Sequence, residues 1–282
     1  MKLSIICVNL NIKNFYSTRA KYDQVLTYLH EEAPQVEHEI ILVDNGSDDD
    51  SVEFFKNKWG KTVNVISLDK NYGFHIGNNT GFKVAKGEYV MVHNPDIKVK
   101  KGDMDNMIAY MEAHPDVALL CPQLASPDGT VQDTYRKFYR PLDFIIKRMK
   151  FLHKISYFKN RMTRLLMWNM DKSKVQEVDW VVGACMIIPR DKFEEIGWYD
   201  ELYHSYMGDT DIAKQFWAKG WKVIYNPEIK ATHGAKRSSG NGFWKSLVKK
   251  TAWIHLIDML RYFWKWKGRL EREKREEVTS DE

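Results

Sequence analysis

The sequence predicts an α/β protein with a doubly wound, mostly parallel sheet and a C-terminal amphipathic helical extension. Two observations predict this class. Over residues 1–125, short apolar runs alternate with segments of helical spacing, and the connections between them are short. Polar residues that suit ligand binding follow several of the apolar runs directly. Chains that alternate strand and helix in this way form parallel sheets covered by helices.

The first elements follow from local patterns. A continuous apolar run over residues 3–9 predicts a buried strand. Apolar residues recur at helical spacing over residues 18–29, which predicts a helix. The run 39–43 predicts a second strand that ends at Asp44. Residues 48–51 are helix-capping types, so we expect a helix directly after them.

The same alternation continues to residue 120. Residues 63–66 predict a third strand, and the turn signal at 71–73 precedes a helix. Residues 89–92 predict a fourth strand. A helix over 103–114 and a fifth strand over 117–120 complete the regular part of the chain.

After residue 125 the alternation becomes irregular. We expect, in order, an apolar segment at 178–189, a turn at 196–200, a short helix at 212–219 that ends at Gly220, a strand at 221–225 stopped by Asn226-Pro227, and a long helix with a charged tail from Trp244.

Length and composition suit one large domain with an appendage. The chain has 282 residues, 44% of them hydrophobic, which is enough for a sizeable core. We expect one domain over residues 1–240, in two halves that meet near residue 125, and a basic amphipathic helix with a charged tail over 241–282. No apolar run reaches about 18 residues, so no membrane-spanning helix is expected.

The N-terminus and the cysteines favour a cytoplasmic protein. The apolar run at residues 3–8 is too short and wrongly flanked for a signal peptide. Cys7, Cys121 and Cys185 lie far apart, and all three sit within or beside apolar runs. This pattern is typical of buried thiols in a reducing compartment.

The positive charge is concentrated in two segments. The chain has a net charge of +5, yet residues 136–164 carry ten Lys and Arg against one acid, Asp143. Residues 245–269 carry seven against Asp258. Both segments are also rich in aromatic and aliphatic residues, a mixture that suits an anionic surface. No zinc-finger spacing or RNA-binding signature is present, so nucleic acid is not an expected partner.

Oxygen-bearing side chains follow the fourth predicted strand. Asn94 and Asp96 come directly after that strand, two residues apart. Mg²⁺ and Mn²⁺ prefer such ligands and often take only one or two from the protein. Asp44 follows the second strand, and carboxyl ends of parallel strands share one edge of a sheet. We therefore expect Asp44 and Asp96 to converge; ordinary turns are the alternative for both.

Two further acidic residues and a histidine are candidates for chemistry. Asp209 and Asp211 lie two residues apart at the start of the predicted helix. One could serve as a general base, although helix N-termini also favour acids for capping and dipole reasons. His233, after a short strand, could serve a metal or a diphosphate, or be structural.

Several enzyme classes lack their signatures here. The spacing Asn71-x-Gly73-x-x-x-Gly77 is not a dinucleotide-binding fingerprint. The sequence has no Walker A loop, no Gly-x-Ser-x-Gly elbow and no His-Glu-x-x-His motif. These gaps count against a dehydrogenase, a P-loop ATPase, a serine hydrolase and a zinc peptidase.

Nine short stretches, in this order, resemble the family 2 glycosyltransferases of the GT-A fold, and within them the bacterial rhamnosyltransferase-like group. The matching stretches are Ser4–Asn9, Ile41–Ser47, Asn71–Phe74 with Gly77–Gly81, Asn94–Asp96, Val182–Met186, Ile196–Asp200, Gly208–Asp211, Gly220–Trp221, and His233 with Ser238. The resemblance covers roughly residues 3–240.

The resemblance implies roles for individual residues. Asp44 would contact the nucleobase, and the rest of the nucleotide site would comprise Asn9, Asn71, Gly73 and Asn94. Asp96 and His233 would hold Mg²⁺ or Mn²⁺. Asp209 would be the catalytic base with Asp211 in support, and the acceptor would lie against Trp180, Gly183 and Ala184. The sequence departs from the family pattern twice: Asn94 replaces an Asp of the metal motif, and Gly208 stands where Glu is usual.

The expected activity is an inverting, metal-assisted glycosyl transfer in the synthesis of cell-surface polysaccharide. The resemblance implies a nucleotide-sugar donor, with dTDP-L-rhamnose as the best choice, and a saccharide or lipid-linked saccharide acceptor. The nucleotide-sugar site would occupy the half of the domain before residue 125 and the acceptor site the half after it. A nucleotidyltransferase of similar fold and an inactive membrane-docked scaffold are the alternatives. A homo-oligomer is left open.

The C-terminal helix is amphipathic. Ala252, Leu256, Met259, Leu260 and Phe263 form an apolar stripe, and His255, Asp258, Arg261 and Lys265 gather opposite. This pattern is typical of a helix that lies in a membrane interface, and it predicts peripheral binding to the inner face of the cell membrane. The alternative is a helix packed on the catalytic domain.

Overall fold

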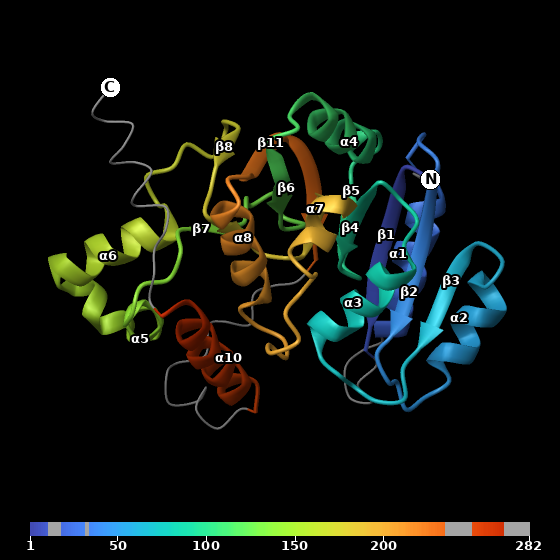
Figure 1. Ribbon diagram of the computed structural model, residues 1–282, viewed down its shortest axis with the longest axis horizontal. Coiled ribbons are helices and arrows are strands. Elements are labelled where there is room, and N and C mark those ends of the chain that lie inside the picture. Colours follow the sequence, from blue (N-terminus) through green and yellow to red (C-terminus); the bar gives the residue numbers. More distant parts are fainter. Residues whose placement is uncertain (11–17, 32–33, 235–249, 268–282) are drawn as a thin grey trace.

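The computed structural model describes residues 1–10, 18–31, 34–234 and 250–267. Its centre is a nine-stranded mixed sheet in the order β3-β2-β1-β4-β10-β6-β11-β5, with β8 paired to β11 (Figure 1). The strands of this sheet are β1 (Leu3–Asn9), β2 (His38–Asp44), β3 (Val63–Ser67), β4 (Tyr89–His93), β5 (Ile97–Val99), β6 (Val117–Ala125), β8 (Gln176–Glu177), β10 (Cys185–Pro189) and β11 (Lys222–His233). A separate ribbon pairs β7 (Tyr135–Arg136) with β9 (Trp180–Val181).

Six of the nine strands, β1 to β4, β6 and β11, run in the same direction, as the alternation of strands and helices predicted. Strands β1 to β4 are parallel to one another, and β6 is parallel to β11. The exception that matters for the site is β10, which runs antiparallel between β4 and β6. Its start therefore lies at the same edge of the sheet as the end of β4, where Cys185 pairs with His93.

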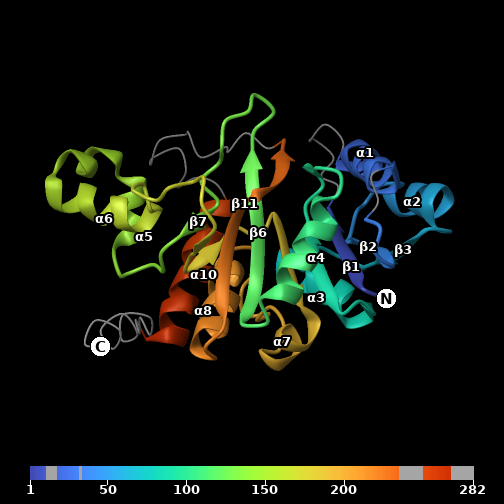
Figure 2. The same cartoon turned by 90° about the horizontal axis from the view of Figure 1, so that it is seen from above.

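Helices cover both faces of the sheet (Figure 2). One buried cluster joins the sheet to α1 (Thr18–Glu31), α2 (Ser51–Trp59) and α4 (Asp103–Ala113). The cluster on the other face includes residues of α3 (Phe74–Val84), α5 (Asp143–Arg148), α6 (Ser156–Leu166), α7 (Arg190–Glu195), α8 (Gly208–Ala218) and α10 (Lys250–Trp266). A short 3-10 helix, η1 (Lys150–Lys154), connects α5 to α6.

Two predicted element boundaries are wrong. Helix α8 begins at Gly208, not at Ile212, because Met207 adopts a left-handed conformation (φ 65°) that starts the helix one turn earlier. Strand β11 does not stop at Asn226-Pro227. Pro227 has no N–H to donate to a neighbouring strand. The register of β11 against β6 is irregular between Asn226 and Lys230, and this irregularity accommodates the proline within the strand.

The C-terminal helix α10 is anchored to the domain by its polar side. Asp258 is fully buried and accepts hydrogen bonds from the backbone N–H groups of His204, Ser205 and Tyr206 at 3.0–3.2 Å. Arg261 donates to the backbone carbonyl of Leu202. Asp258 and Arg261, which were predicted to lie opposite the apolar stripe, therefore hold the helix to the loop before α8.

The apolar stripe of α10 is not the exposed surface that the sequence suggested. Ala252 and Met259 are buried, and Leu256 and Phe263 pack against the core. Leu260, the fifth residue of the predicted stripe, is exposed instead, and it belongs to a second apolar stripe at a helical spacing of four, three and four residues: Trp253 (56% exposed), Ile257 (44%), Leu260 (58%) and Trp264 (77%).

The buried carboxylate of Asp258 gives a test of this anchoring. Asp258→Ala leaves three backbone N–H groups without their acceptor, and we expect the free energy of unfolding to fall by at least about 2 kcal/mol. Urea unfolding monitored by circular dichroism measures it. The matched control is Asp116→Ala, which removes an exposed ion pair with Lys222 and is expected to cost under about 1 kcal/mol. Equal losses for the two variants would contradict the anchoring role.

Candidate active site

The ends of β1 and β2 place Asn9 and Asp44 side by side. The two residues pair in register, and both side chains are fully buried. Asn9 Nδ2 donates to Asp44 Oδ1 at 2.6 Å, and Ser47 donates to both oxygens of Asp44, from its backbone N–H and from its hydroxyl. Among the described residues, Asn9 Oδ1 is a buried acceptor with no hydrogen-bond partner.

An asparagine that the sequence analysis did not single out joins the next two candidates. The side chain of Asn45 donates to Asn71 Oδ1 at 3.2 Å and to the backbone carbonyl of Gly73 at 2.9 Å. It also accepts from the backbone N–H of Tyr72 at 3.1 Å. These bonds tie the loop after β2 to the turn before α3. An Asp-Asn-Gly turn was the only local signal, and such turns are common.

The end of β11 brings His233 to Asp96. Pairing of β11 with β5 sets His233 opposite Ile97, and His233 Nε2 lies 3.5 Å from Asp96 Oδ2. The other ring nitrogen, Nδ1, lies 2.8 Å from Gln132 Oε1, while the amide nitrogen of Gln132 donates to the His233 backbone carbonyl. Nδ1 therefore donates to Gln132, and Nε2 faces the carboxylate of Asp96.

This pair suits a divalent cation. A metal-binding imidazole commonly donates its other N–H to an oxygen acceptor, as His233 does to Gln132. Within the described ranges no group of three or more His, Cys, Asp or Glu residues could hold a metal ion. An arrangement with two protein ligands matches the way Mg²⁺ is usually held, with phosphate oxygens and water completing the shell.

The neighbouring His93 lies in the core. It is 1% exposed, and neither ring nitrogen has a hydrogen-bond partner among the residues that the structure describes. Burial lowers the pKa of His93 to about 4, so the ring is neutral at physiological pH. Its role in the strand is packing next to Cys185.

Asp209 lies in the first turn of α8 and contacts the segment that leads into β10. Its Oδ2 accepts from the backbone N–H of Gly183 at 2.9 Å, and its Oδ1 accepts from the Tyr199 hydroxyl at 3.2 Å. A Cβ at position 183 would lie 2.3 Å from Asp209 Oδ1, so any side chain there would displace the carboxylate. The segment before β10 thus fixes the position of this half-buried carboxylate.

The same segment connects Asp209 to the residues after β4. The backbone carbonyl of Ala184 accepts from the backbone N–H of Asn94 at 2.9 Å. Gly183 and Ala184 are adjacent, so one contacts the candidate base and the other the candidate metal loop. The polar residues at the ends of β1, β2, β4 and β11 therefore lie along one edge of the sheet.

The pKa of Asp209 is set by opposing influences. Burial raises the pKa of this carboxyl group, whereas the nearby His75 and the hydrogen bonds from Gly183 and Tyr199 lower it. Burial also lowers the pKa of His75, and Asp209 raises it. The sequence analysis gave no role to His75 or to Tyr199, which lies in the matching stretch Ile196–Asp200, because both look like ordinary core residues.

Two other predicted site residues are occupied by internal contacts. Asp211 is fully buried, and its oxygens accept from Tyr203, Gln215, Lys265 and Trp266. Trp180 is 8% exposed, and its indole N–H donates to the Lys137 backbone carbonyl. The roles of Asp211 in supporting the base and of Trp180 in binding the acceptor stay predictions.

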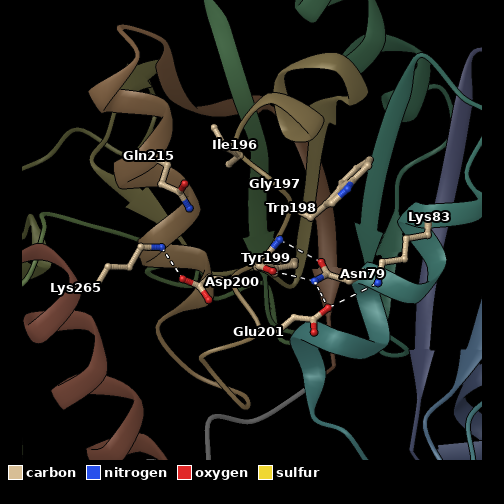
Figure 3. Close-up of a pocket in the computed structure, with 10 residues that line it drawn as sticks. All are labelled: Asn79, Lys83, Ile196, Gly197, Trp198, Tyr199, Asp200, Glu201, Gln215 and Lys265. Carbon is tan, nitrogen blue, oxygen red and sulfur yellow. Dashed lines mark hydrogen bonds and ion pairs between the residues drawn. The ribbon is translucent and has the colours of Figure 1, made fainter.

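A pocket of about 310 Å³ is lined by the loop 196–201 together with Asn79, Lys83, Gln215 and Lys265 (Figure 3). Asn79 exchanges two hydrogen bonds with the Tyr199 backbone. Lys265 pairs with Asp200 at one side, and Lys83 pairs with Glu201 at the other. These contacts hold the loop 196–201, which carries the Tyr199 hydroxyl to Asp209.

Comparisons with known proteins identify the family. Residues 22–197 match the model of glycosyl transferase family 2, which is more than half of the chain. The chain belongs to this family, whose members are glycosyltransferases.

Two bacterial rhamnosyltransferases are among its relatives. The chain is 24% identical over 239 residues to the N-acetylglucosaminyl-diphospho-decaprenol L-rhamnosyltransferase of Mycobacterium tuberculosis, covering 80% of this chain and 76% of the relative. It is 26% identical over 199 residues to the rhamnosyltransferase WbbL of Escherichia coli K12, covering 68% of this chain and 70% of the relative. These matches confirm the expected resemblance to a rhamnosyltransferase-like group.

Solved structures with 17% sequence identity share the fold. GalNAc-T7, solved with UDP, GalNAc and Mn²⁺, superposes with a TM-score of 0.62 over 85% of this chain and 44% of its own. The mannosyltransferase PcManGT of Pyrobaculum calidifontis, solved with GDP-Man and Mn²⁺, gives 0.56 over 87% and 60%. This chain thus spans less than two thirds of each solved chain. The expected GT-A α/β fold is confirmed.

Proposed function

We propose that this protein transfers L-rhamnose from dTDP-L-rhamnose to a saccharide or lipid-linked saccharide acceptor, with inversion at the anomeric carbon, in the synthesis of a cell-surface polysaccharide. The observation that carries the proposal is the continuity of the site. Gly183 holds Asp209, and Ala184, the next residue, holds the loop of Asn94 and Asp96. The two rhamnosyltransferase relatives support the choice of sugar, and the name of the mycobacterial one supports a lipid-linked acceptor.

The nucleotide would lie over the ends of β1 and β2. Asn9 Oδ1 is a buried acceptor, and an imide N–H of a pyrimidine base would satisfy it. Asp44 holds the amide of Asn9 in this orientation through the 2.6 Å hydrogen bond to Nδ2. Asn71 and Gly73, joined by Asn45, would contact the nucleoside from the neighbouring turn.

Asp96 and His233 would hold Mg²⁺ or Mn²⁺, with Asn94 beside them, and the bound ion would neutralise charge that develops on the departing nucleoside diphosphate. The solved relatives in fold that contain a nucleotide and Mn²⁺ support this assignment. Gln132 fixes the orientation of the His233 ring for it.

Asp209 would be the general base. Its carboxylate takes the proton of an acceptor hydroxyl while that oxygen attacks the anomeric carbon from the face opposite the diphosphate. The new glycosidic bond forms as the bond to the diphosphate oxygen breaks. Hydrogen bonds from Gly183 and Tyr199 keep the carboxylate oriented. A positioned general base contributes about 10²–10⁴-fold to the rate.

Replacement of the base tests the reaction. Asp209→Asn keeps the size of the side chain but cannot accept the proton, so we expect the rate of rhamnosyl transfer to fall by at least about 10²-fold. Release of dTDP from dTDP-L-rhamnose with a GlcNAc-diphospho-lipid acceptor measures it, and dTDP binding should be unchanged. An Asp209→Asn enzyme of normal activity would overturn the assignment of the base. Release of pyrophosphate by the wild type would indicate nucleotidyl transfer.

Ligand-induced stabilisation tests the donor site without any acceptor. At about 100 times its dissociation constant, a nucleotide should stabilise the fold by about 2.7 kcal/mol. We expect dTDP with Mg²⁺ or Mn²⁺ to raise the melting temperature more than UDP or GDP does. Asp96→Ala should remove the metal-dependent part of the shift. The control is Asp171→Ala, which removes an exposed carboxylate near Lys174. A full metal response in Asp96→Ala would contradict the metal assignment.

Peripheral binding of the protein to the inner face of the cell membrane would fit a lipid-linked acceptor. No helix in the described part of the chain is long and apolar enough to cross a membrane. The exposed stripe of α10 offers two tryptophans, Trp253 and Trp264, with Ile257 and Leu260 between them. Helix α5 lies next to α10, because the ring centres of Phe144 on α5 and His255 on α10 are 4.8 Å apart.

The segment around α5 and α6 adds both charge and apolar surface. Residues 136–164 carry ten Lys and Arg, of which Arg136 is buried and Arg161 and Arg164 pair with the buried Asp143. Each of the other basic residues that reaches an anionic leaflet would add about 1 kcal/mol. Exposed apolar side chains lie among them, at Leu142, Ile145, Phe151, Ile155 and Tyr157. Exposed apolar side chains interspersed with cations match an anionic lipid surface better than a neutral one.

Sedimentation with liposomes tests this surface. We expect the protein to sediment with vesicles containing anionic phospholipid and to be released by high salt, because salt screens the lysines and arginines. The double variant Trp253→Ser/Trp264→Ser should bind more weakly at every salt concentration. The control is Val84→Ser, at an exposed apolar position on α3. Binding that is the same for anionic and neutral vesicles, and the same for the double variant and the wild type, would contradict the proposal.

A further inference from the structure

Position 208 has no room for a side chain. A Cβ there would lie 2.2 Å from His75 Nε2 and within 2.7 Å of two ring carbons of His75. The ring of His75 thus occupies the space in front of the residue that precedes Asp209. This is a physical reason for the glycine at the position where the family resemblance leads one to expect glutamate.

The ring of His75 is held rigidly. His75 is 1% exposed, and its Nδ1 lies 3.0 Å from the backbone carbonyl of Tyr203, to which it donates. Its ring centre lies 4.9 Å from that of Tyr199, whose hydroxyl donates to Asp209 at 3.2 Å. The imidazole therefore contacts both the start of α8 and the tyrosine that orients the carboxylate.

We propose that His75 is a positioning residue for Asp209: its imidazole fills the space at Gly208 and holds the carboxylate, partly through Tyr199, in the position for removing the acceptor proton. This inference rests on the proposed role of Asp209 as the base. According to this proposal, a side chain of α3, on the donor side of the site, positions the base on α8.

Charge adds to this positioning. His75 lowers the pKa of Asp209, and the negative charge of Asp209 raises the pKa of His75, each against the effect of burial. Other groups act on His75 as well: Asp211 on α8, Asp258 on α10, Asp200, and the Tyr203 carbonyl in the loop between α7 and α8. Replacement of His75 by a neutral residue should therefore raise the pKa of Asp209 and shrink the pH range in which the base is ionised.

The coupling can be measured without any substrate. The pKa of His75 is obtained from the pH dependence of its ring-proton NMR signals, assigned through His75→Gln. In Asp209→Asn we expect the pKa of His75 to fall, because the charge that raises it is gone. Asp171→Asn, which removes a distant exposed carboxylate, should leave it unchanged. An unchanged pKa of His75 in Asp209→Asn would overturn the proposal, whether or not the donor sugar is correct.

A double-variant cycle measures the packing. Gly208→Ala should lower the melting temperature, because its Cβ collides with the ring. In His75→Ala/Gly208→Ala the collision is gone, so the double variant should melt higher than the sum of the two single shifts predicts. Additive shifts would show that the ring does not exclude a side chain at position 208.

The pH profile separates positioning from mere packing. For dTDP release with an acceptor, the acidic limb of kcat/KM should move to higher pH in His75→Gln, because the charge that lowers the pKa of Asp209 is gone. The control is His114→Gln, an exposed histidine directly after the end of α4, which should leave the profile unchanged. A lower rate in His75→Gln with an unshifted acidic limb would mean that His75 only packs, and would overturn the positioning role.

Discussion

The site depends on the two backbone hydrogen bonds made by Gly183 and Ala184. One goes from the Gly183 N–H to Asp209, and the other comes from the Asn94 N–H to the Ala184 carbonyl. Both exist because β10 runs antiparallel between β4 and β6, so that its first residue lies beside the last residue of β4. A single reversed strand in an otherwise parallel region therefore brings the acceptor-side base to the donor-side metal loop. Neither group could be moved independently of the other.

The loop before α8 extends this constraint to the C-terminal helix. Asp258 holds the backbone of residues 204–206, and Lys265 and Trp266 hold Asp211 in the first turn of α8. The basic helix that was expected to be an appendage thus supports the helix that carries Asp209. Its exposed stripe of Trp253, Ile257, Leu260 and Trp264 faces away from these anchors. A lipid surface bound to that stripe would contact the same helix that holds the first turn of α8.

Most of the fold and part of the site could be predicted from sequence because they are local. The apolar runs of β1 to β4 and β6, the helical spacing between them and the acids at strand ends each carry a periodic or positional signal. For residues such as His75, Tyr199 and Asn45, no local pattern shows which residues they contact. Their neighbours are distant in sequence: His75 bonds to Tyr203, and Asn79 on the same helix bonds to Tyr199. The sequence also could not show which apolar stripe of α10 packs against the core, because either stripe could do so.

The sequence by itself determined the alternating α/β order, the polar residues at the carboxyl ends of the strands and the departure at Gly208, because these depend on residue type and spacing along the chain. Only the tertiary structure decided which groups meet. Strand pairing set His233 3.5 Å from Asp96, and packing of α3 on α8 put the ring of His75 where a side chain at position 208 would lie. Contacts of this kind depend on which distant surfaces bury one another, and no local pattern records that choice.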